Sequence, residues 1–312
     1  TIDRAEGRPR PVGRPAPCPD PALRPDRASV TEIETWIRDP YAVHARRILK
    51  LDPLDPIGGT IGAAERGTFV HEVLAAFVAA GHSPRGADAV DRLIALGEEK
   101  LAAFDAFPEV VALWRPRLAS VARWWVAQEA TREALVAERH PEIGGRLELR
   151  IDGLPFVLTG RADRIDLMGD GSVVLIDYKT GKPPSEAQVQ SLLSPQLALE
   201  TAMVRAGAFD HRGSTGFAGR TIGEIAYVHL KGGAEGGTWE RRGKTTDGRP
   251  PEGLADAALD RLIELVRVFR HPATGYASRP RVQFEKARGG PYDHLARVAE
   301  WAAGESGEGG EV

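Results

Sequence analysis

The spacing of apolar residues predicts helices in the first part of the chain. From Ala63 to Ala80, apolar side chains recur at positions 70, 73, 74, 77 and 78, which is the spacing of one buried helix face. Two more helices are expected at 87–104 and 109–134. Three tryptophans in the second of these stretches are predicted to be core residues: Trp114, Trp124 and Trp125.

An earlier helix is predicted to begin at Ser29. Ser29 and Glu32 have the spacing of a capping box, in which each side chain accepts a backbone N–H at the helix start. An apolar face follows, and Pro40 ends or kinks the helix. The next segment carries a basic group, for which we expect a solvated helix face and, as the alternative, a patch that contacts phosphate: Arg46, Arg47 and Lys50.

The pattern then changes to the short period of strands. Three strands are expected at 145–152, 154–167 and 172–178, joined by turns at Asp152-Gly153 and Gly169-Asp170-Gly171. Ser194 and Pro195 predict the start of a helix that Gly207 ends, and a further strand at 222–230 and a helix at 252–269 follow. Helices combined with meandering strands predict an α+β fold, with helices on the faces of a mixed sheet.

The chain has no internal repeat and is expected to form one folded body. Residues 1–28 are rich in Pro and Arg and are expected to be a linker, and the Gly/Glu-rich residues 304–312 a disordered tail. The body, residues 29–303, divides into a helical part at about 29–134, an α/β core at about 138–230 and a C-terminal helix with its extension at 252–303. Because the chain starts at Thr1 without a signal-peptide pattern, we expect a fragment of a longer protein.

Composition narrows the classes of function. With 312 residues and a formal net charge of −3, the protein is not expected to coat nucleic acid nonspecifically, although a local basic groove is compatible with that charge. The single cysteine, Cys18, excludes an intramolecular disulfide and a multi-cysteine metal site, and fits a bacterial cytoplasmic location. No apolar run is long enough for a membrane span, so no membrane partner is expected.

Two carboxylates interrupt strands that are otherwise apolar. Asp163 lies within the second predicted strand and Asp177 near the end of the third. If the intervening turn has three residues, paired residue numbers sum to 340 and the two aspartates face each other on one side of the sheet, where their charges repel. A two-residue turn would send them to opposite sides. Lys179 points to the same side as Asp177.

A divalent cation between the two aspartates would remove this repulsion. Oxygen ligands suit Mg²⁺ or Mn²⁺ better than zinc, and a neighbouring ammonium suits the hydrolysis of a phosphodiester. The alternative is purely structural. In that case Asp177 and Lys179 form an ion pair at a strand end, and Asp163 pairs with Arg161 or Arg164.

The motifs resemble a known family. GRADRID (160–166), LIDYKTGK (175–182) and SPQLALE (194–200) resemble the RecB-like branch of the PD-(D/E)XK nucleases, whose motifs run G-x-x-D, (D/E)-x-K and Q-x-x-x-Y. The segments SVTEIETWIRDPYAVHARRILKL (29–51) and GPYDHLARVAEW (290–301) are similar to the C-terminal nuclease domain of AddB proteins. Those proteins belong to AddAB helicase–nucleases, which process double-strand DNA ends.

The resemblance implies a restriction-endonuclease-like core and a set of site residues. It makes Asp163, Asp177, Lys179 and Gln196 catalytic, with metal ligands from Asp163, Asp177, the backbone carbonyl of Tyr178 and, through the match of GTFVHEVL (67–74), His71. Glu200 stands where the family often has Tyr. It further implies a Mg²⁺-dependent, exonuclease-type deoxyribonuclease that takes a single strand from an unwound DNA end, with an AddA-like subunit as partner in double-strand break repair.

Two cofactors are not expected. Some relatives hold an iron–sulfur cluster with four cysteines, which this chain lacks. Gly243-Lys244-Thr245 resembles the end of a P-loop motif. The first glycine of that motif would fall at position 238, which is Thr238, so we expect no ATP site. A catalytically inactive nuclease fold that binds DNA or scaffolds a complex is the alternative function, and a stand-alone exonuclease a third.

Overall fold

The computed structural model describes residues 13–53, 61–209, 216–243, 248–279 and 289–305. The chain forms two compact units, residues 57–261 and residues 1–56 together with 262–312. Within the described residues, no helix has both the length and the apolar character that a membrane crossing requires.

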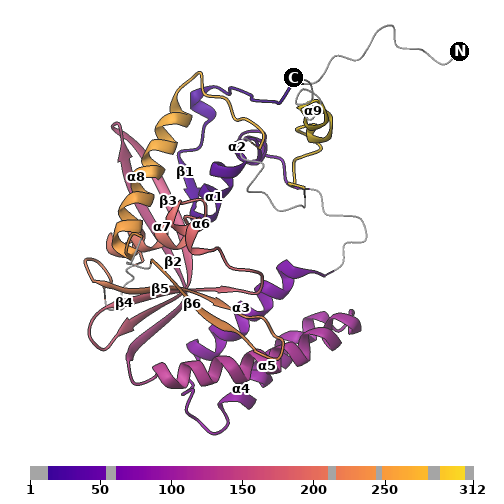
Figure 1. Ribbon diagram of the computed structural model, residues 1–312, viewed down its shortest axis with the longest axis vertical. Helices are drawn as coiled ribbons and strands as arrows, with labels where there is room; N and C mark the ends of the chain where they lie inside the picture. The colour runs from indigo at the N-terminus through magenta and orange to yellow at the C-terminus, as the bar shows by residue number, and fades with distance from the viewer. Residues whose placement is uncertain (1–12, 54–60, 210–215, 244–247, 280–288, 306–312) are drawn as a thin grey trace, which may run out of the picture. The chain divides into compact units, whose positions relative to one another are not determined.

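The unit of residues 57–261 is built on a mixed β-sheet (Figure 1). Strand β2 pairs antiparallel with β3, β3 antiparallel with β4, β4 parallel with β5, and β5 antiparallel with β6. Together with the helices on its faces, this sheet confirms the predicted α+β fold with a central antiparallel hairpin. The strands are β2 (Val136–Ile151), β3 (Leu154–Met168), β4 (Val173–Lys179), β5 (Ile222–His229) and β6 (Thr238–Arg242).

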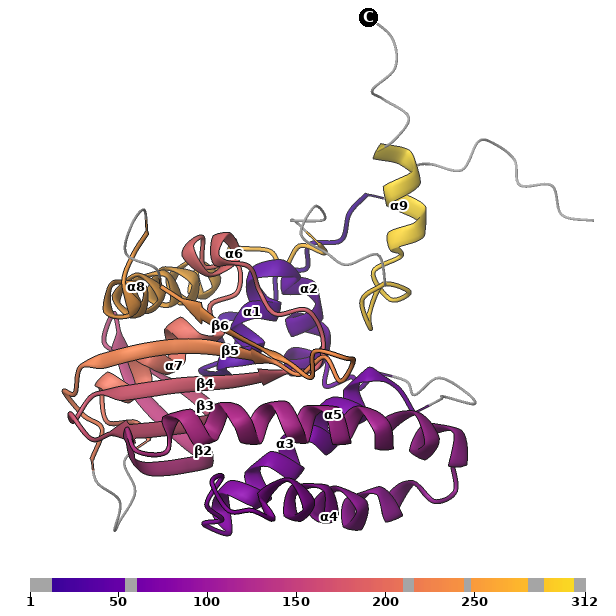
Figure 2. The same ribbon diagram turned by 60° about the horizontal axis from the view of Figure 1, so that its bottom comes forward.

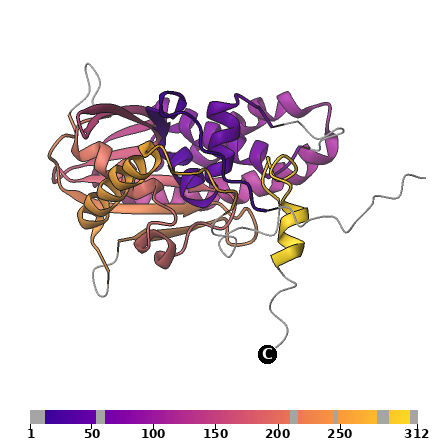
Figure 3. The same cartoon turned by 90° about the horizontal axis from the view of Figure 1, so that it is seen from above.

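Helices cover both faces of this sheet. Helices α3, α4 and α5 lie on one side of the sheet and α7 on the other, as Figure 2 shows; Figure 3 gives the view from above. The three pack onto Val174, Ile176 and Tyr178, which are alternate residues of β4 and therefore share one face. The helices of this unit are α3 (Ala63–Ala79), α4 (Ala89–Leu101), the short η3 (Ala102–Phe104), α5 (Pro108–Arg132), α6 (Glu186–Gln190) and α7 (Gln196–Arg205).

The second unit contains the first helices and the last. The capping box predicted at Ser29 and Glu32 is present, and Pro40 stands at the first position of a new helix after Asp39 ends the previous one. Its elements are η1 (Pro21–Leu23), β1 (Arg27–Ser29), α1 (Val30–Arg38), α2 (Pro40–Val43), the π-helical turn η2 (His44–Ile48) and α9 (Val298–Glu305). Helix α8 (Pro251–Arg270) crosses the division between the units.

The stretch expected to be a linker differs from that expectation where it is described. The Arg24 side chain is 8% exposed, and its guanidinium donates to the backbone carbonyls of Pro19, Phe269, His271 and Pro272 at 2.6–3.1 Å. Residues 13–28 are therefore packed against the C-terminal part of their own unit. Residues 1–12 and the tail from 306 onward lie outside the described residues.

Several element boundaries differ from the sequence-based predictions. Strand β2 begins at Val136 rather than at 145, and β6 and α9 occupy stretches that the sequence left unassigned. Helix α7 begins at Gln196, so Pro195 is its cap and not its first residue. Trp124 is only partly buried, and it packs at the edge of the helical core beside the glycines of the β5–β6 loop. Residues 244–247 of the P-loop-like stretch are not described.

Candidate active site

Strands β3 and β4 bring the two predicted aspartates together. Arg164 pairs with Ile176, and in this pair and the three that follow along β3 the two residue numbers add up to 340. The same register, continued by one residue, places Asp163 opposite Asp177. The turn between the strands has three residues, since Met168 N–H donates to Ser172 O at 2.8 Å. The predicted turn and register are therefore confirmed.

A third carboxylate, that of Glu142, joins this row from β2. The pairs on either side of Glu142 align it with Asp163 across β2 and β3. Its backbone φ of 52° lies in the left-handed region that a non-glycine residue enters at a cost. Sequence analysis missed Glu142. The only signal was a carboxylate just before the predicted strand, and the long pairing of β2 was not foreseen.

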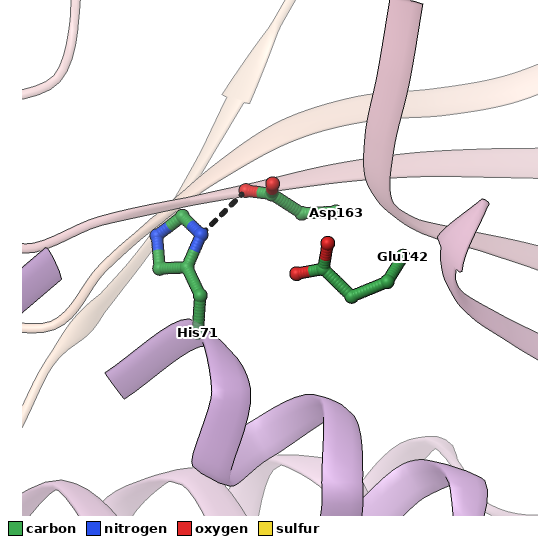
Figure 4. A group of neighbouring side chains, drawn as sticks. All are labelled: His71, Glu142 and Asp163. Carbon is green, nitrogen blue, oxygen red and sulfur yellow. Dashed lines mark ion pairs between the residues drawn. The ribbon is translucent and has the colours of Figure 1, made fainter. Parts of the chain in front are cut away.

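His71 of α3 approaches Asp163. Its Nδ1 atom lies 3.4 Å from Asp163 Oδ2, and that oxygen also accepts the backbone N–H of Tyr178 at 2.8 Å. His71, Glu142 and Asp163 each offer one ligand atom, and these atoms lie within 4.8 Å of one another (Figure 4). Glu142 also pairs with Arg161 at 2.7 Å. The three side chains form a group that could hold a metal ion.

The predicted lysine and glutamine meet at Asp177. Lys179 Nζ lies 2.6 Å from Asp177 Oδ2 and donates to Gln196 Oε1 at 3.2 Å. The Gln196 amide nitrogen donates to Asp177 Oδ1 at 2.6 Å and to Glu200 Oε1 at 3.2 Å. Asp177 and Glu200 are both buried, whereas Lys179 and Gln196 are half-buried and face the open side of the site.

Burial dominates the electrostatics of the carboxyl groups. It raises the pKa of Asp177 to about 6, with a contribution from Asp163 and against the attraction of Lys179. Burial also raises the pKa of Glu142, and repulsion by Asp163 adds to it. The pKa of Glu200 is raised well above its ordinary value by burial and by the charges of Asp177 and Asp163. In the absence of a cation, the site holds more carboxylate than it can keep ionised at low cost.

The two basic side chains respond in the opposite sense. For His71, burial lowers the pKa, but the hydrogen bond and charge of Asp163 together with Asp177 outweigh burial, so the pKa is raised. For Lys179, burial again acts downward and Asp177 outweighs it, so the pKa is raised. Both cations are held by the same carboxylates that a metal ion would share.

The structural alternative from the sequence accounts for only part of this geometry. Asp177 and Lys179 do form an ion pair. Asp163, however, does not find its partner in either candidate arginine, because Arg161 pairs with Glu142 and Arg164 pairs with Asp166 and Glu129. Neither of the two candidate arginines therefore offsets the repulsion between the facing aspartates.

The donor set fits a divalent cation. Two carboxylates and one imidazole lie within reach of one ion, and ligands of these types bind divalent metal ions in proteins. The group of ligand atoms overlaps the predicted metal set at His71 and Asp163. It contains Glu142 in place of Asp177 and the Tyr178 carbonyl, so the division of ligands between Glu142 and Asp177 stays open to experiment.

A family model matches most of the chain. The model of the PD-(D/E)XK nuclease superfamily matches residues 27–289. The chain belongs to the PD-(D/E)XK nuclease superfamily. Membership in a superfamily of nucleases makes a phosphodiester of a nucleic acid the class of bond on which such a site acts, and it agrees with the acidic row, the histidine and the lysine.

The curated relatives are similar to part of this chain. An uncharacterized protein of Rickettsia bellii is 30% identical over 182 residues, which are 58% of this chain and 22% of that protein. An uncharacterized protein of Rickettsia typhi is 28% identical over 207 residues, 65% of this chain and 24% of its own length. The chain thus spans less than a quarter of these relatives. The crystal structure of SSO0001 aligns with 90% of this chain and 85% of its own at 10% identity, but its TM-score of 0.35 carries no argument.

Proposed function

We propose that this chain is a metal-dependent deoxyribonuclease that hydrolyses phosphodiester bonds. The observation that carries the proposal is the row of Glu142, Asp163 and Asp177 across β2, β3 and β4, with His71 and Lys179 beside it. A purely structural role does not require three buried or half-buried acids side by side, because such groups repel and lose their hydration.

The chain's own residues divide into two tasks in this proposal. His71, Asp163 and either Glu142 or Asp177 would hold Mg²⁺ or Mn²⁺. When bound, the cation would polarise the phosphate and lower the pKa of an attacking water. Lys179 would orient that water or offset the negative charge that develops on the phosphate. Gln196 fixes Lys179 by accepting a hydrogen bond from its ammonium at 3.2 Å and by donating one to Asp177.

The cellular role belongs to the same proposal. The resemblance of residues 29–51 and 290–301 to AddB proteins supports an exonuclease-type activity within a helicase–nuclease complex. There an AddA-like partner would deliver a single strand from an unwound end during double-strand break repair.

The test is cleavage of end-labelled single- and double-stranded DNA with Mg²⁺, Mn²⁺ or a chelator, with and without an AddA-like subunit. Wild-type protein should cut only with a divalent cation, and Asp163→Asn and Lys179→Met should lose at least about 100-fold in rate. The matched control is Asp105→Asn, which changes an exposed carboxylate in the turn after η3. If the wild type binds DNA but never cuts it with any cation, the inactive scaffold is the better description.

A further inference from the structure

The candidate active site poses an electrostatic problem for its own substrate. Asp163, Asp177, Glu142 and Glu200 place four carboxyl groups close together, and the whole chain has a net charge of −3. A nucleic-acid strand is a polyanion, so these acids repel it even when a cation neutralises part of their charge. Binding therefore requires cationic side chains next to the site that hold the neighbouring phosphates.

Arg66 is tied to the end of β4. It lies in the first turn of α3, five residues before His71, and its Nη2 atom donates to the backbone carbonyl of Thr180 at 3.4 Å. Thr180 directly follows Lys179. An ideal Cβ on the adjacent Gly67 would lie 3.5 Å from the Thr180 hydroxyl, so α3 runs close beside this strand end. Arg66 therefore stands at the end of the strand that carries the catalytic lysine.

Arg117 is placed against the end of the next strand, β5. It lies on α5, and its Cβ would be 2.8 Å from an ideal Cβ on Gly232, in the loop that follows β5. Gly232 has a φ of 65°, a conformation that glycine adopts without strain. A side chain there would collide with the stem of Arg117, so this close approach requires glycine.

The two strand ends are neighbours. Strands β4 and β5 run parallel, and Leu230 N–H donates to Lys179 O at 2.8 Å, just past their last paired residues. Arg66 and Arg117 thus flank the carboxyl end of one parallel strand pair, at the end where Lys179 is found. In sheets of this kind, ligands bind outside the carboxyl ends of parallel strands.

Neither arginine is neutralised within the part of the chain that the structure describes, where no carboxylate lies within 4.0 Å of either guanidinium. Burial and the positive charge of Arg117 lower the pKa of Arg66. By contrast, Arg115, two residues from Arg117 on the same helix, pairs with Glu98 at 2.7 Å. Two like charges kept together without an acidic partner are favourable when an external anion completes the site.

We propose that Arg66 and Arg117 form a phosphate-binding subsite for the sugar–phosphate backbone of the nucleic-acid strand, next to the phosphodiester that is cut. The proposal rests on the proposed nuclease function for the identity of the anion. The subsite fixes the path of the strand past Lys179 and makes no contact with base edges, so it carries no sequence preference.

Binding can be measured without cleavage. The anisotropy of an end-labelled oligothymidine is followed with Ca²⁺ replacing Mg²⁺ over a range of salt concentrations, and a denaturing gel checks that the probe stays intact. Arg66→Gln and Arg117→Gln should each weaken binding about tenfold. Each should also reduce the slope of log K against log salt by about 0.7, the contribution of one phosphate contact on a single strand. Arg66→Lys, which keeps the charge, should retain most of the slope.

The matched control is Arg115→Gln, which removes an exposed arginine from the same helix about 200° around its axis. It should bind as the wild type does. Wild-type affinity and slope in both Arg66→Gln and Arg117→Gln would overturn the proposal, as would weaker binding with an unchanged slope, which indicates a structural role. Failure of the nuclease function appears separately, as absent Mg²⁺-dependent cleavage while the two arginine variants still lose affinity.

Discussion

Cation binding at the acidic row should raise the thermal stability of the protein. The perturbation is addition of Mg²⁺ or Mn²⁺ to chelator-treated protein. A ligand that binds only the folded state stabilises it by RT ln(1 + [L]/Kd), about 2.7 kcal/mol when its concentration is 100 times Kd. The site lies in the unit of residues 57–261. For a unit of this size, 1 kcal/mol corresponds to about 2–4 °C. The expected rise in melting temperature is therefore about 5–11 °C.

The variants in this assay separate the two ligand sets. Asp163→Asn and His71→Ala should lose most of the rise, because both residues belong to the predicted set and to the observed cluster. Glu142→Gln loses it only if Glu142 is a ligand, and Asp177→Asn only if Asp177 is one. Asp105→Asn, on the surface, is the control.

Differential scanning fluorimetry and calorimetric titration of the same variants provide the measurement. An equal temperature rise in wild type and Asp163→Asn would mean that the cation binds elsewhere and would refute the assignment. So would unchanged melting of the wild type at cation concentrations that saturate cleavage. A lowered melting temperature of His71→Ala in chelator, with wild-type cation affinity, would instead make His71 a structural residue.

Three further results are expected. Arg164→Met should cost up to about 3–5 kcal/mol in urea unfolding, because the buried carboxylates of Asp166 and Glu129 lose their buried cation and keep only more exposed arginines such as Arg132. Arg92→Met at an exposed ion pair should change stability by less than about 0.5 kcal/mol. Glu200→Gln, which keeps an acceptor for the neighbouring amide, should retain kcat, whereas Glu200→Ala should lower kcat with little change in KM. In chelator, the free energy of unfolding should fall as pH rises from about 4 to about 6. In this range native Asp177, with its pKa raised to about 6, binds more protons than the same residue of the unfolded chain. The fall should be smaller in Asp177→Asn, and a steeper fall in that variant would contradict the assignment.

The features predicted correctly from the sequence depend on short stretches of chain. The capping box joins Ser29 to Glu32 within one helical turn, and the three-residue turn between β3 and β4 sets the register that aligns Asp163 with Asp177. Once that turn is fixed, the alternation of side chains in a strand leaves no freedom in the facing of the two acids. The central pair of the site was therefore predictable to the residue.

The features that were missed depend on contacts distant in sequence. Glu142 joins the site only because β2 extends back to Val136 along β3, and nothing local in its polar first half indicates a strand. Residues 13–28 of the Pro/Arg-rich segment pack onto their own unit because Arg24 bonds to carbonyls about 245 residues away, which no composition argument reveals. Arg66 and Arg117 come to one strand end through two different helices. Pairing of this kind is a property of the tertiary structure and not of the local pattern.

The two faces of β4 show how the acidic row is kept in place. Asp177 and Lys179 reach Gln196 of α7, whereas Tyr178 between them receives a hydrogen bond at 3.3 Å from the fully buried Arg164. Arg164 also binds the carboxylates of Asp166 on β3 and Glu129 on α5. Replacing such a buried ionic network with apolar residues is often neutral for stability, so we expect this network to contribute mainly by fixing one arrangement. The network joins β3, β4 and α5 directly behind the aspartates. Strands that carry facing acids would otherwise lower their electrostatic free energy by moving apart, and the candidate metal site would move with them.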